Sequence, residues 1–188
     1  MAGDAVARDL TRLTTRIARC TKCPLHMSRT RTVPGEGPAN ARIVLVGEAP
    51  GREEDRRGKP FVGAAGRVLD EALLRAGLSR GDVFITNVVK CRPPRNRRPS
   101  RDEADACDAY LAGQIEAVRP RVIVAMGQTA ARALLGPGTA LSKVRGRWRR
   151  VLGTPALTTY HPAAILYNRR LSRTLAADLA RARRRAEG

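Results

Sequence analysis

The chain has 188 residues, 43% of them hydrophobic, which is enough for one domain of ordinary size with a buried core. Its 36 Lys and Arg residues against 17 Asp and Glu residues give a net charge of +19, which favours a polyanionic partner, most simply nucleic acid. No apolar run approaches membrane-spanning length, and residues 1–19 lack the apolar core of a secretory signal. We therefore expect a cytoplasmic protein with no membrane contact.

The basic residues are strongly biased toward arginine, because only four of the 36 are lysines. A GC-rich coding genome would explain the preference for Arg over Lys. It would not explain why basic residues outnumber acidic ones, so nucleic acid remains the expected partner, without any sequence specificity implied.

Apolar segments alternate with helical patterns along the chain, as in a parallel-stranded α/β domain. Helices are predicted at residues 1–19, 66–77, 100–118, 127–135 and 163–185, the third beginning with a capping box formed by Ser100 and Glu103. Strands are predicted at residues 42–46, 82–87, 121–126 and 156–160. Without internal repeats or linkers, we expect one domain over residues 1–188, a three-layer α/β/α sandwich around a central four-stranded parallel sheet.

Three unusual segments follow the predicted strands at their carboxyl ends: Gly47–Gly51, Asn87–Cys91 and Tyr160–Pro162. Parallel strands bring these ends to one edge of a sheet, where ligands bind. Taken singly, Glu48 is typical of a solvated turn and His161 of a structural histidine. Their shared position indicates a functional cleft.

The four cysteines form a second pattern. Cys20 and Cys23 lie in C-T-K-C, and Cys91 and Cys107 follow far along the chain. A CxxC pair with two distant cysteines, and none left over, indicates a four-thiolate site for a metal or an iron–sulfur cluster. Disulfides are the alternative, which a reducing cytosol disfavours.

Five segments carry a resemblance to a known family: G-E-A-P-G with E-D close behind, K-P-F-V-G, T-N-V-V-K-C-R-P-P, S-K-V-R-G-R-W and Y-H-P-A-A-I-L-Y-N. In this order they are typical of the family 4 uracil-DNA glycosylases, the iron–sulfur members of their superfamily, which the chain resembles over roughly residues 16–180. The resemblance implies excision of uracil from single- or double-stranded DNA, leaving an abasic site. It also implies a [4Fe–4S] cluster and uracil-containing DNA as partner, and we expect a monomer.

The resemblance further implies a role for each site residue. Phe61 stacks on uracil, Asn87 pairs with uracil O4 and N3–H and so rejects cytosine, and His161 donates a hydrogen bond to O2. Glu48 orients or activates the attacking water, so Glu48 and His161 are the catalytic residues. The implied uracil-binding residues are Gly47, Glu48, Ala49, Gly51, Phe61, Asn87 and His161. The implied cluster ligands are Cys20, Cys23, Cys91 and Cys107.

Two further segments are expected to contact DNA. Residues 145–150 interleave one Trp with four Arg, which suits phosphate contacts, although a solvated hairpin whose Trp caps the core is an alternative. Leu166 is a candidate wedge for the gap that a flipped base leaves. The expected DNA-contact residues are Arg145, Arg147, Leu166 and Asn168.

Departures from related patterns leave alternatives open. The best-known uracil glycosylases carry G-Q-D-P-Y, with an Asp one residue after the position of Glu48 and a Tyr that excludes the thymine methyl, where this chain has Ala49 and Gly51. The family 4 pattern accommodates this difference, which leaves Glu48 as the expected catalytic carboxylate and Asp55 as a weaker candidate. Relatives that crosslink to uracil-DNA carry a basic loop ending in a nucleophilic His, whereas Arg92–Ser100 contains none, so turnover is expected. Zinc is an alternative to the cluster, and a non-catalytic nucleic-acid-binding module is an alternative to an enzyme.

Overall fold

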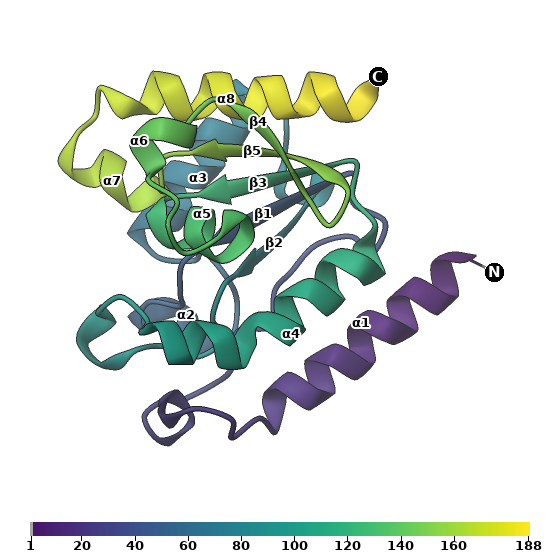
Figure 1. Cartoon of the computed structure of the whole chain (residues 1–188), viewed down its shortest axis with the longest axis vertical. Coiled ribbons are helices and arrows are strands. Elements are labelled where there is room, and N and C mark those ends of the chain that lie inside the picture. Colours follow the sequence, from purple (N-terminus) through teal and green to yellow (C-terminus); the bar gives the residue numbers. More distant parts are fainter. Residues whose placement is uncertain (1) are drawn as a thin grey trace.

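The computed structural model describes residues 2–188, and a five-stranded sheet lies at its centre (Figure 1). In sheet order the strands are β2 (Val83–Asn87), β1 (Ile43–Gly47), β3 (Val122–Met126), β5 (Thr154–Thr159) and β4 (Trp148–Val151). The first four run parallel, whereas β4 pairs antiparallel with β5 at the edge. The parallel sheet predicted from the sequence is confirmed, with one additional strand.

Strand β4 is hard to recognise in the sequence because Arg149 and Arg150 at its middle are exposed. It turns back into β5 through Leu152 and Gly153, which adopt positive φ angles of 47° and 77°, as a tight hairpin turn requires. Trp148 packs half-buried against the core. Residues 148–150 therefore belong to a hairpin with Trp148 against the core, which was the alternative interpretation of the Arg-rich segment at residues 145–150.

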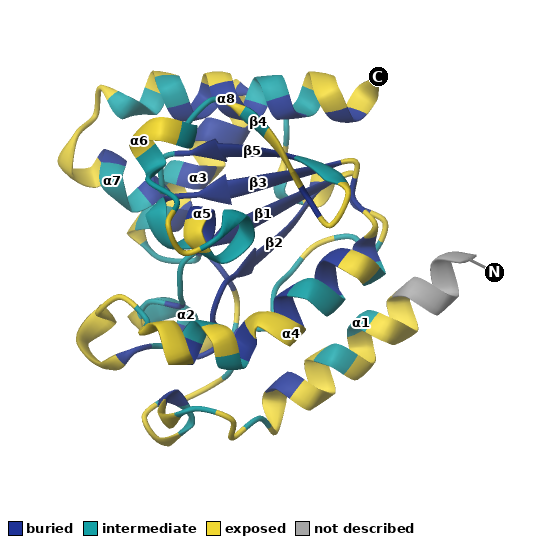
Figure 2. Ribbon diagram, viewed as in Figure 1, coloured by how far each residue is buried: buried dark blue, intermediate teal, exposed yellow. Residues whose placement is uncertain are grey.

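Helices cover both faces of the sheet, which confirms the three-layer α/β/α arrangement (Figures 1 and 2). The helices are α1 (Ala2–Ala18), α2 (Arg52–Arg57), α3 (Ala64–Arg75), α4 (Arg101–Val118), α5 (Gln128–Leu135), α6 (Leu141–Val144), α7 (Pro162–Tyr167) and α8 (Leu171–Glu187), with short 3₁₀ turns η1 (Pro24–Met27), η2 (Arg80–Asp82) and η3 (Pro94–Asn96). One core cluster joins the sheet to α4 and α5, and α1 packs outside α4. The other joins the sheet to α3, α7 and α8.

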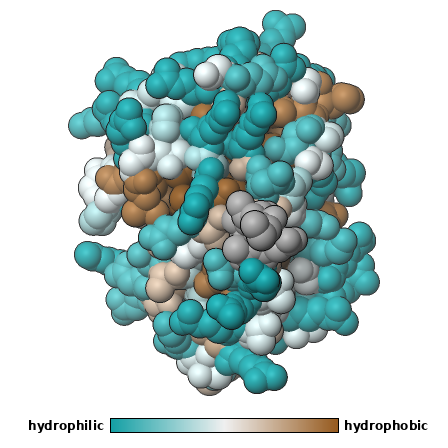
Figure 3. Space-filling model, turned by 90° about the vertical axis from the view of Figure 1, so that its right-hand side faces the viewer, coloured by the Kyte–Doolittle hydropathy of each residue, from teal (hydrophilic) through white to brown (hydrophobic). Residues whose placement is uncertain are grey.

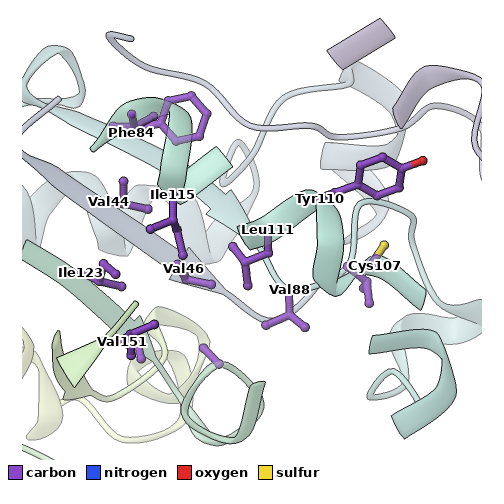
Figure 4. Packing of buried hydrophobic residues seen from close by; sticks show 14 of the residues in the cluster. Val44, Val46, Phe84, Val88, Cys107, Tyr110, Leu111, Ile115, Ile123 and Val151 are labelled. Carbon is purple, nitrogen blue, oxygen red and sulfur yellow. The ribbon is translucent and has the colours of Figure 1, made fainter. Parts of the chain in front are cut away.

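The parallel strands are buried on both faces, so their side chains alternate between the two core clusters. Val44 and Val46 of β1 face α4, where Leu111 and Ile115 pack on them (Figure 4). Leu45, between the two valines, faces the opposite cluster. A continuous apolar run in the sequence thus serves two cores.

The prediction of one helix over residues 163–185 is wrong, because the chain breaks between α7 and α8. The side-chain Oδ1 of Asn168 accepts a hydrogen bond from the Arg170 backbone N–H at 3.2 Å, which is a local turn that competes with helix continuation. The predicted helix at residues 1–19 corresponds to α1, while Met1 lies outside the described residues.

Hydrophilic side chains cover most of the face shown in Figure 3, in keeping with the high net charge. Over the described part of the chain, each helix is too short or too polar to cross a membrane.

Candidate active site at the carboxyl ends of the strands

A cavity of about 240 Å³ lies where β1 and β2 end and α7 begins. Six of the residues predicted to bind uracil line it together: Glu48, Ala49, Gly51, Phe61, Asn87 and His161. The seventh, Gly47, lies directly opposite Asn87 in the paired strands. The strand-end segments that were grouped by topology in the sequence therefore meet in space.

Asn87 contributes an unpaired polar atom to this cavity. Asn87 is 1% exposed, and its side-chain Oδ1 is buried without a hydrogen-bond partner. A Cβ on Gly47 would come within 2.4 Å of this Oδ1 and 2.6 Å of the Phe61 Cζ, so glycine is needed for the close approach. A buried amide oxygen without a partner is rare in proteins and indicates a site for a ligand.

Phe61 forms the neighbouring wall in a backbone conformation that is unusual for phenylalanine, with a φ angle of 52°. Its carbonyl accepts a hydrogen bond from Arg80, and a Cβ on Gly66 would lie 1.9 Å from the same oxygen. The Phe61 ring lies 5.6 Å from the His161 ring, centroid to centroid. Local strain held by surrounding contacts is typical of functional sites.

His161 caps the N-terminus of α7 with its ring Nδ1, which accepts a hydrogen bond from the Ala163 backbone N–H at 3.1 Å. The other ring nitrogen, Nε2, is buried without a partner. Burial lowers the pKa of His161 to about 4, while the nearby Glu54 carboxylate opposes this shift. The imidazole is therefore neutral at pH 7, and its N–H lies on Nε2.

Glu48 lies in the loop after β1 and lines the same cavity. Its Oε2 accepts a short hydrogen bond from the hydroxyl of Thr129, near the start of α5. This contact orients the carboxylate. Thr129 was not singled out from the sequence, because a threonine after a strand-end glycine carries no specific signal.

Glu54, the glutamate of the E-D pair that follows G-E-A-P-G, is a further cavity residue, and the sequence assigned it no role. Its Oε1 accepts hydrogen bonds from the backbone N–H groups of Val62 and Gly63, both at 2.8 Å, and its Oε2 from that of Gly51 at 3.1 Å. The signal was a Glu three residues after a plausible N-cap at Gly51, the capping-box spacing. Glu54 joins the loop after β1 to the Phe61 segment.

Asp55, the weaker catalytic candidate, has a different position. It is 3% exposed and accepts hydrogen bonds from the backbone N–H groups of Thr30 and Arg31. It does not line the cavity that contains Glu48. Its contacts hold the loop at residues 30–31 against α2.

All four cysteines line a second, narrow cavity between α1, η1 and α4. They are free thiols, and Cys91 and Cys107 are each 5% exposed. Arg29 donates hydrogen bonds to the Cys91 Sγ at 3.2 Å and to the Cys20 carbonyl at 2.8 Å. The structure thus brings together four residues that lie up to 87 positions apart (20 to 107).

The surroundings of the thiols are basic. Lys22, Arg29 and Lys90 line the same cavity. Burial raises the pKa of the Cys91 thiol to about 11, against the opposing effect of Arg29, and burial is also the main cause that raises the pKa of Cys107. Among the residues that the structure describes, no three His, Cys, Asp or Glu side chains are grouped to hold a single metal ion.

The residues predicted to contact DNA lie in different settings. Arg145 is held by an ion pair with Asp178 at 3.4 Å, and its guanidinium lies over the Tyr160 ring at 5.3 Å. Arg147 is exposed between α6 and β4. Leu166 is 48% exposed at the end of α7, next to Tyr167 at 93%, and Asn168 follows them on the surface.

A third cavity, of about 490 Å³, lies between the start of α4 and α5. Arg98, Arg101 and Arg132 line it together with Asp105 and Asp108, and Arg101 pairs with Asp105 at 3.5 Å. Thr129, which binds Glu48, also lines this cavity. This cavity therefore adjoins the candidate active site.

Comparison with known proteins places this geometry in a family context. Residues 34–183 match the model of the uracil DNA glycosylase superfamily. A type-4 uracil-DNA glycosylase from Pyrobaculum aerophilum is 49% identical over 180 residues, which cover 92% of each chain. Type-4 uracil-DNA glycosylases from Archaeoglobus fulgidus and Thermotoga maritima are 48% and 47% identical, covering 86% and 89% of this chain and 85% and 90% of their own.

Proposed function

The chain belongs to the uracil-DNA glycosylase superfamily, within its type-4 group, and we propose that it removes uracil from DNA. It hydrolyses the N-glycosidic bond of deoxyuridine and leaves an abasic site, the first step of base-excision repair. The observation that carries this proposal is the pair of buried, unpartnered polar atoms, Asn87 Oδ1 and His161 Nε2, in one cavity with Phe61 and Glu48.

Base recognition follows from the chemistry of the cavity. A flipped uracil presents N3–H and O4 on its Watson–Crick edge, which suit an Asn amide. Asn87 Oδ1 is buried and free to accept the N3–H, while the Phe61 ring offers a stacking surface. Cytosine has an acceptor at N3 and a donor at N4, so it would leave Asn87 mispaired inside a buried site, which disfavours it strongly.

The departing base is stabilised by His161. When the glycosidic bond breaks, uracil leaves as an anion with negative charge on O2. The neutral His161 ring holds its N–H on Nε2, because Nδ1 accepts the Ala163 N–H. A preorganised donor aimed at a developing oxyanion lowers the barrier without any proton transfer.

Glu48 acts on the sugar side of the bond. Its carboxylate, oriented by Thr129, positions the attacking water and stabilises the cation-like sugar. Turnover rather than covalent trapping is expected, because Arg92–Ser100 carries no histidine. The second histidine, His26, lines the cysteine cavity instead.

We further propose that the four cysteines hold a [4Fe–4S] cluster. The shared cavity, the cationic wall and the Arg29 N–H···S contact support it, because thiolates need compensating positive charge and hydrogen bonds to sulfur are typical of cluster sites. The cluster would be structural, since glycosidic hydrolysis requires no electron transfer. It would join the N-terminal segment to the loop after Asn87 and to α4.

The cluster proposal has a direct test. The purified protein should be brown, with visible absorbance that dithionite bleaches and about four irons per chain by metal analysis. A colourless protein containing one zinc would instead support the zinc alternative. Loss of the absorbance in Cys107→Ser, with Lys143→Ser on the exposed side of α6 as the surface control, would assign the ligand.

We also propose the setting in which the enzyme acts. Its partner is uracil-containing DNA, attracted by the net charge of +19, and it acts as a monomer. A cytoplasmic location suits four free thiols that remain available to a cluster.

The activity is tested with uracil-containing oligonucleotides, single- and double-stranded, treated with alkali to reveal abasic sites. Wild-type protein should release uracil, while Asn87→Ala and His161→Ala should be slowed by about 100-fold or more with cluster absorbance retained. A non-catalytic nucleic-acid-binding module predicts DNA binding without product. Absence of product from the wild type would refute the proposed function.

A further inference from the structure

Lys90 is the largest side chain in the core that is fully buried, at 1% exposed. It lies three residues after Asn87 and directly before Cys91. Long charged side chains are almost never fully buried unless their polar groups are satisfied. No step of the proposed reaction uses this amine, so its burial needs another explanation.

Three acceptors surround the Lys90 amine. Its Nζ donates to the Asn87 carbonyl at 2.6 Å, to Thr86 Oγ1 at 2.7 Å and to Gln114 Oε1 at 2.7 Å. In its ammonium form the amine has three protons, one for each of these acceptors. Two of these acceptors belong to the end of β2, where the base-reading residue lies.

The acceptors are themselves anchored. Gln114, buried on α4, donates from Nε2 to the Pro34 carbonyl at 2.6 Å, and the Thr86 hydroxyl lies 2.9 Å from the same oxygen. The Lys90 amine is thus held directly by β2 and α4, and its acceptors Thr86 and Gln114 are held in turn by the Pro34 carbonyl. A buried network in which every polar group has a partner makes the surrounding backbone rigid and favours a single conformation.

Unlike the Lys90 amine, the side-chain oxygen of Asn87 makes no hydrogen bond within the protein. Its direction must come from the backbone of residue 87 and from packing against Gly47 and Phe61. The Lys90 amine holds that backbone through the Asn87 carbonyl.

We propose that Lys90 is a positioning residue for uracil recognition, which fixes the Asn87 backbone so that the Asn87 amide meets the base in one orientation. The inference rests on the proposed function and adds to it a residue that never touches the substrate. Because Lys90 also lines the cysteine cavity, it joins the two sites of the molecule through side-chain contacts. Gln114 supports the amine from α4.

The test is a double-mutant cycle between Lys90→Met and Asn87→Ala. Methionine keeps the length of the side chain and removes the amine. Lys90→Met should lower kcat for uracil release from single-stranded DNA by about 10- to 100-fold, with KM changed by less than about 3-fold. In the Asn87→Ala background, measured under single turnover, the same change should cost less than about 3-fold, because Lys90 acts through Asn87.

Lys143→Met is the matched control, since Lys143 is exposed on α6 and loses the same charge. It should keep the wild-type rate. A Lys90→Met enzyme at the wild-type rate would overturn the proposal. So would an equal loss in the Asn87→Ala background, which indicates a general structural role.

Folding is checked by the thermal midpoint and the visible absorbance of each variant. If Lys90→Met does not fold, Gln114→Met enters the same cycle, since it removes one acceptor of the amine and leaves Lys90 in place. A loss of about 5-fold or more that vanishes in Asn87→Ala supports the proposal, and an unchanged rate overturns it. Wild-type protein that releases no uracil would count against the proposed function, whereas an active wild type with an unimpaired variant counts against Lys90 alone.

Discussion

Gly47 and Asn87 lie opposite each other at the ends of neighbouring parallel strands, and a Cβ on Gly47 would come within 2.4 Å of Asn87 Oδ1. The same Cβ would meet Phe61 Cζ at 2.6 Å. A methyl group at this position must therefore displace both walls of the base site. The cavity can keep its shape only if residue 47 has no side chain.

We predict that Gly47→Ala lowers kcat/KM for uracil excision by about 100-fold, because a small misplacement of aligned groups is costly. Overpacking should also lower the free energy of unfolding by about 1–3 kcal/mol. Steady-state kinetics and denaturant unfolding measure the two effects. Gly138→Ala is the control, since a Cβ there meets nothing within 4 Å, and equal losses in both variants would contradict the explanation.

Glu54 carries the second prediction. Its carboxylate accepts three backbone N–H groups that join the loop after β1 to the Phe61 segment. In Glu54→Gln an NH₂ group replaces one oxygen, so one of these bonds becomes a contact between two donors. We expect a loss of about 10- to 100-fold in kcat/KM from the misplaced pocket wall.

Glu53→Gln is the matched control for this change. Glu53 is the preceding residue on α2, and its carboxylate pairs with Arg56 and Arg57 at the surface. Exposed ion pairs contribute little, so activity should stay within about 2-fold of wild type. Equal effects of the two substitutions would show that charge, and not the three N–H contacts, matters at Glu54.

The parallel sheet and the location of the site could be predicted from the sequence because both depend on local patterns. Strands buried on both faces appear as continuous apolar runs, and the unusual residues follow directly after them. Strand β4 could not be recognised this way, because Arg149 and Arg150 interrupt its apolar character. The break at Asn168 depends on one side-chain turn within a strongly helical pattern.

The tertiary contacts of the supporting residues could not be predicted from the sequence for a different reason. Glu54 binds backbone groups eight and nine residues away, and Lys90 binds Gln114, 24 residues away. Such contacts depend on tertiary structure and leave no periodic pattern. Residue types that would bind uracil are visible in the sequence, whereas the long-range contacts that hold them in place are not.

The third prediction concerns pH. Burial lowers the pKa of His161 to about 4, whereas an unfolded chain has a histidine pKa of about 6.5. Between these values the unfolded state binds more protons, so the free energy of unfolding falls as the pH falls from about 6.5 to about 4. Above that window both states are neutral and the effect vanishes.

Two measurements check this prediction. The ring proton of His161, followed by NMR, should keep its neutral chemical shift down to about pH 5. The thermal midpoint of the wild type should drop more between pH 7 and pH 4.5 than that of His161→Gln, which has no imidazole to protonate. A titration of His161 near its ordinary value would contradict the buried, neutral ring.

The last prediction concerns the DNA strand beside the flipped base. Arg98 and Arg132 line the cavity between α4 and α5, which adjoins Glu48 through Thr129. If each binds one phosphate, Arg98→Ala and Arg132→Ala should weaken binding to undamaged single-stranded DNA and make the plot of log K against log salt shallower by about 0.7 each. Fluorescence anisotropy at several salt concentrations measures both quantities.

Arg184→Ala removes the same charge from the last turn of α8, which packs at the amino ends of the strands, far from the carboxyl-end site. Long-range attraction alone would change all three variants alike, because it depends on net charge. Direct phosphate contacts predict a shallower slope for Arg98→Ala and Arg132→Ala and an unchanged slope for Arg184→Ala. Identical slopes in all three variants would exclude the cavity between α4 and α5 from the path of the DNA.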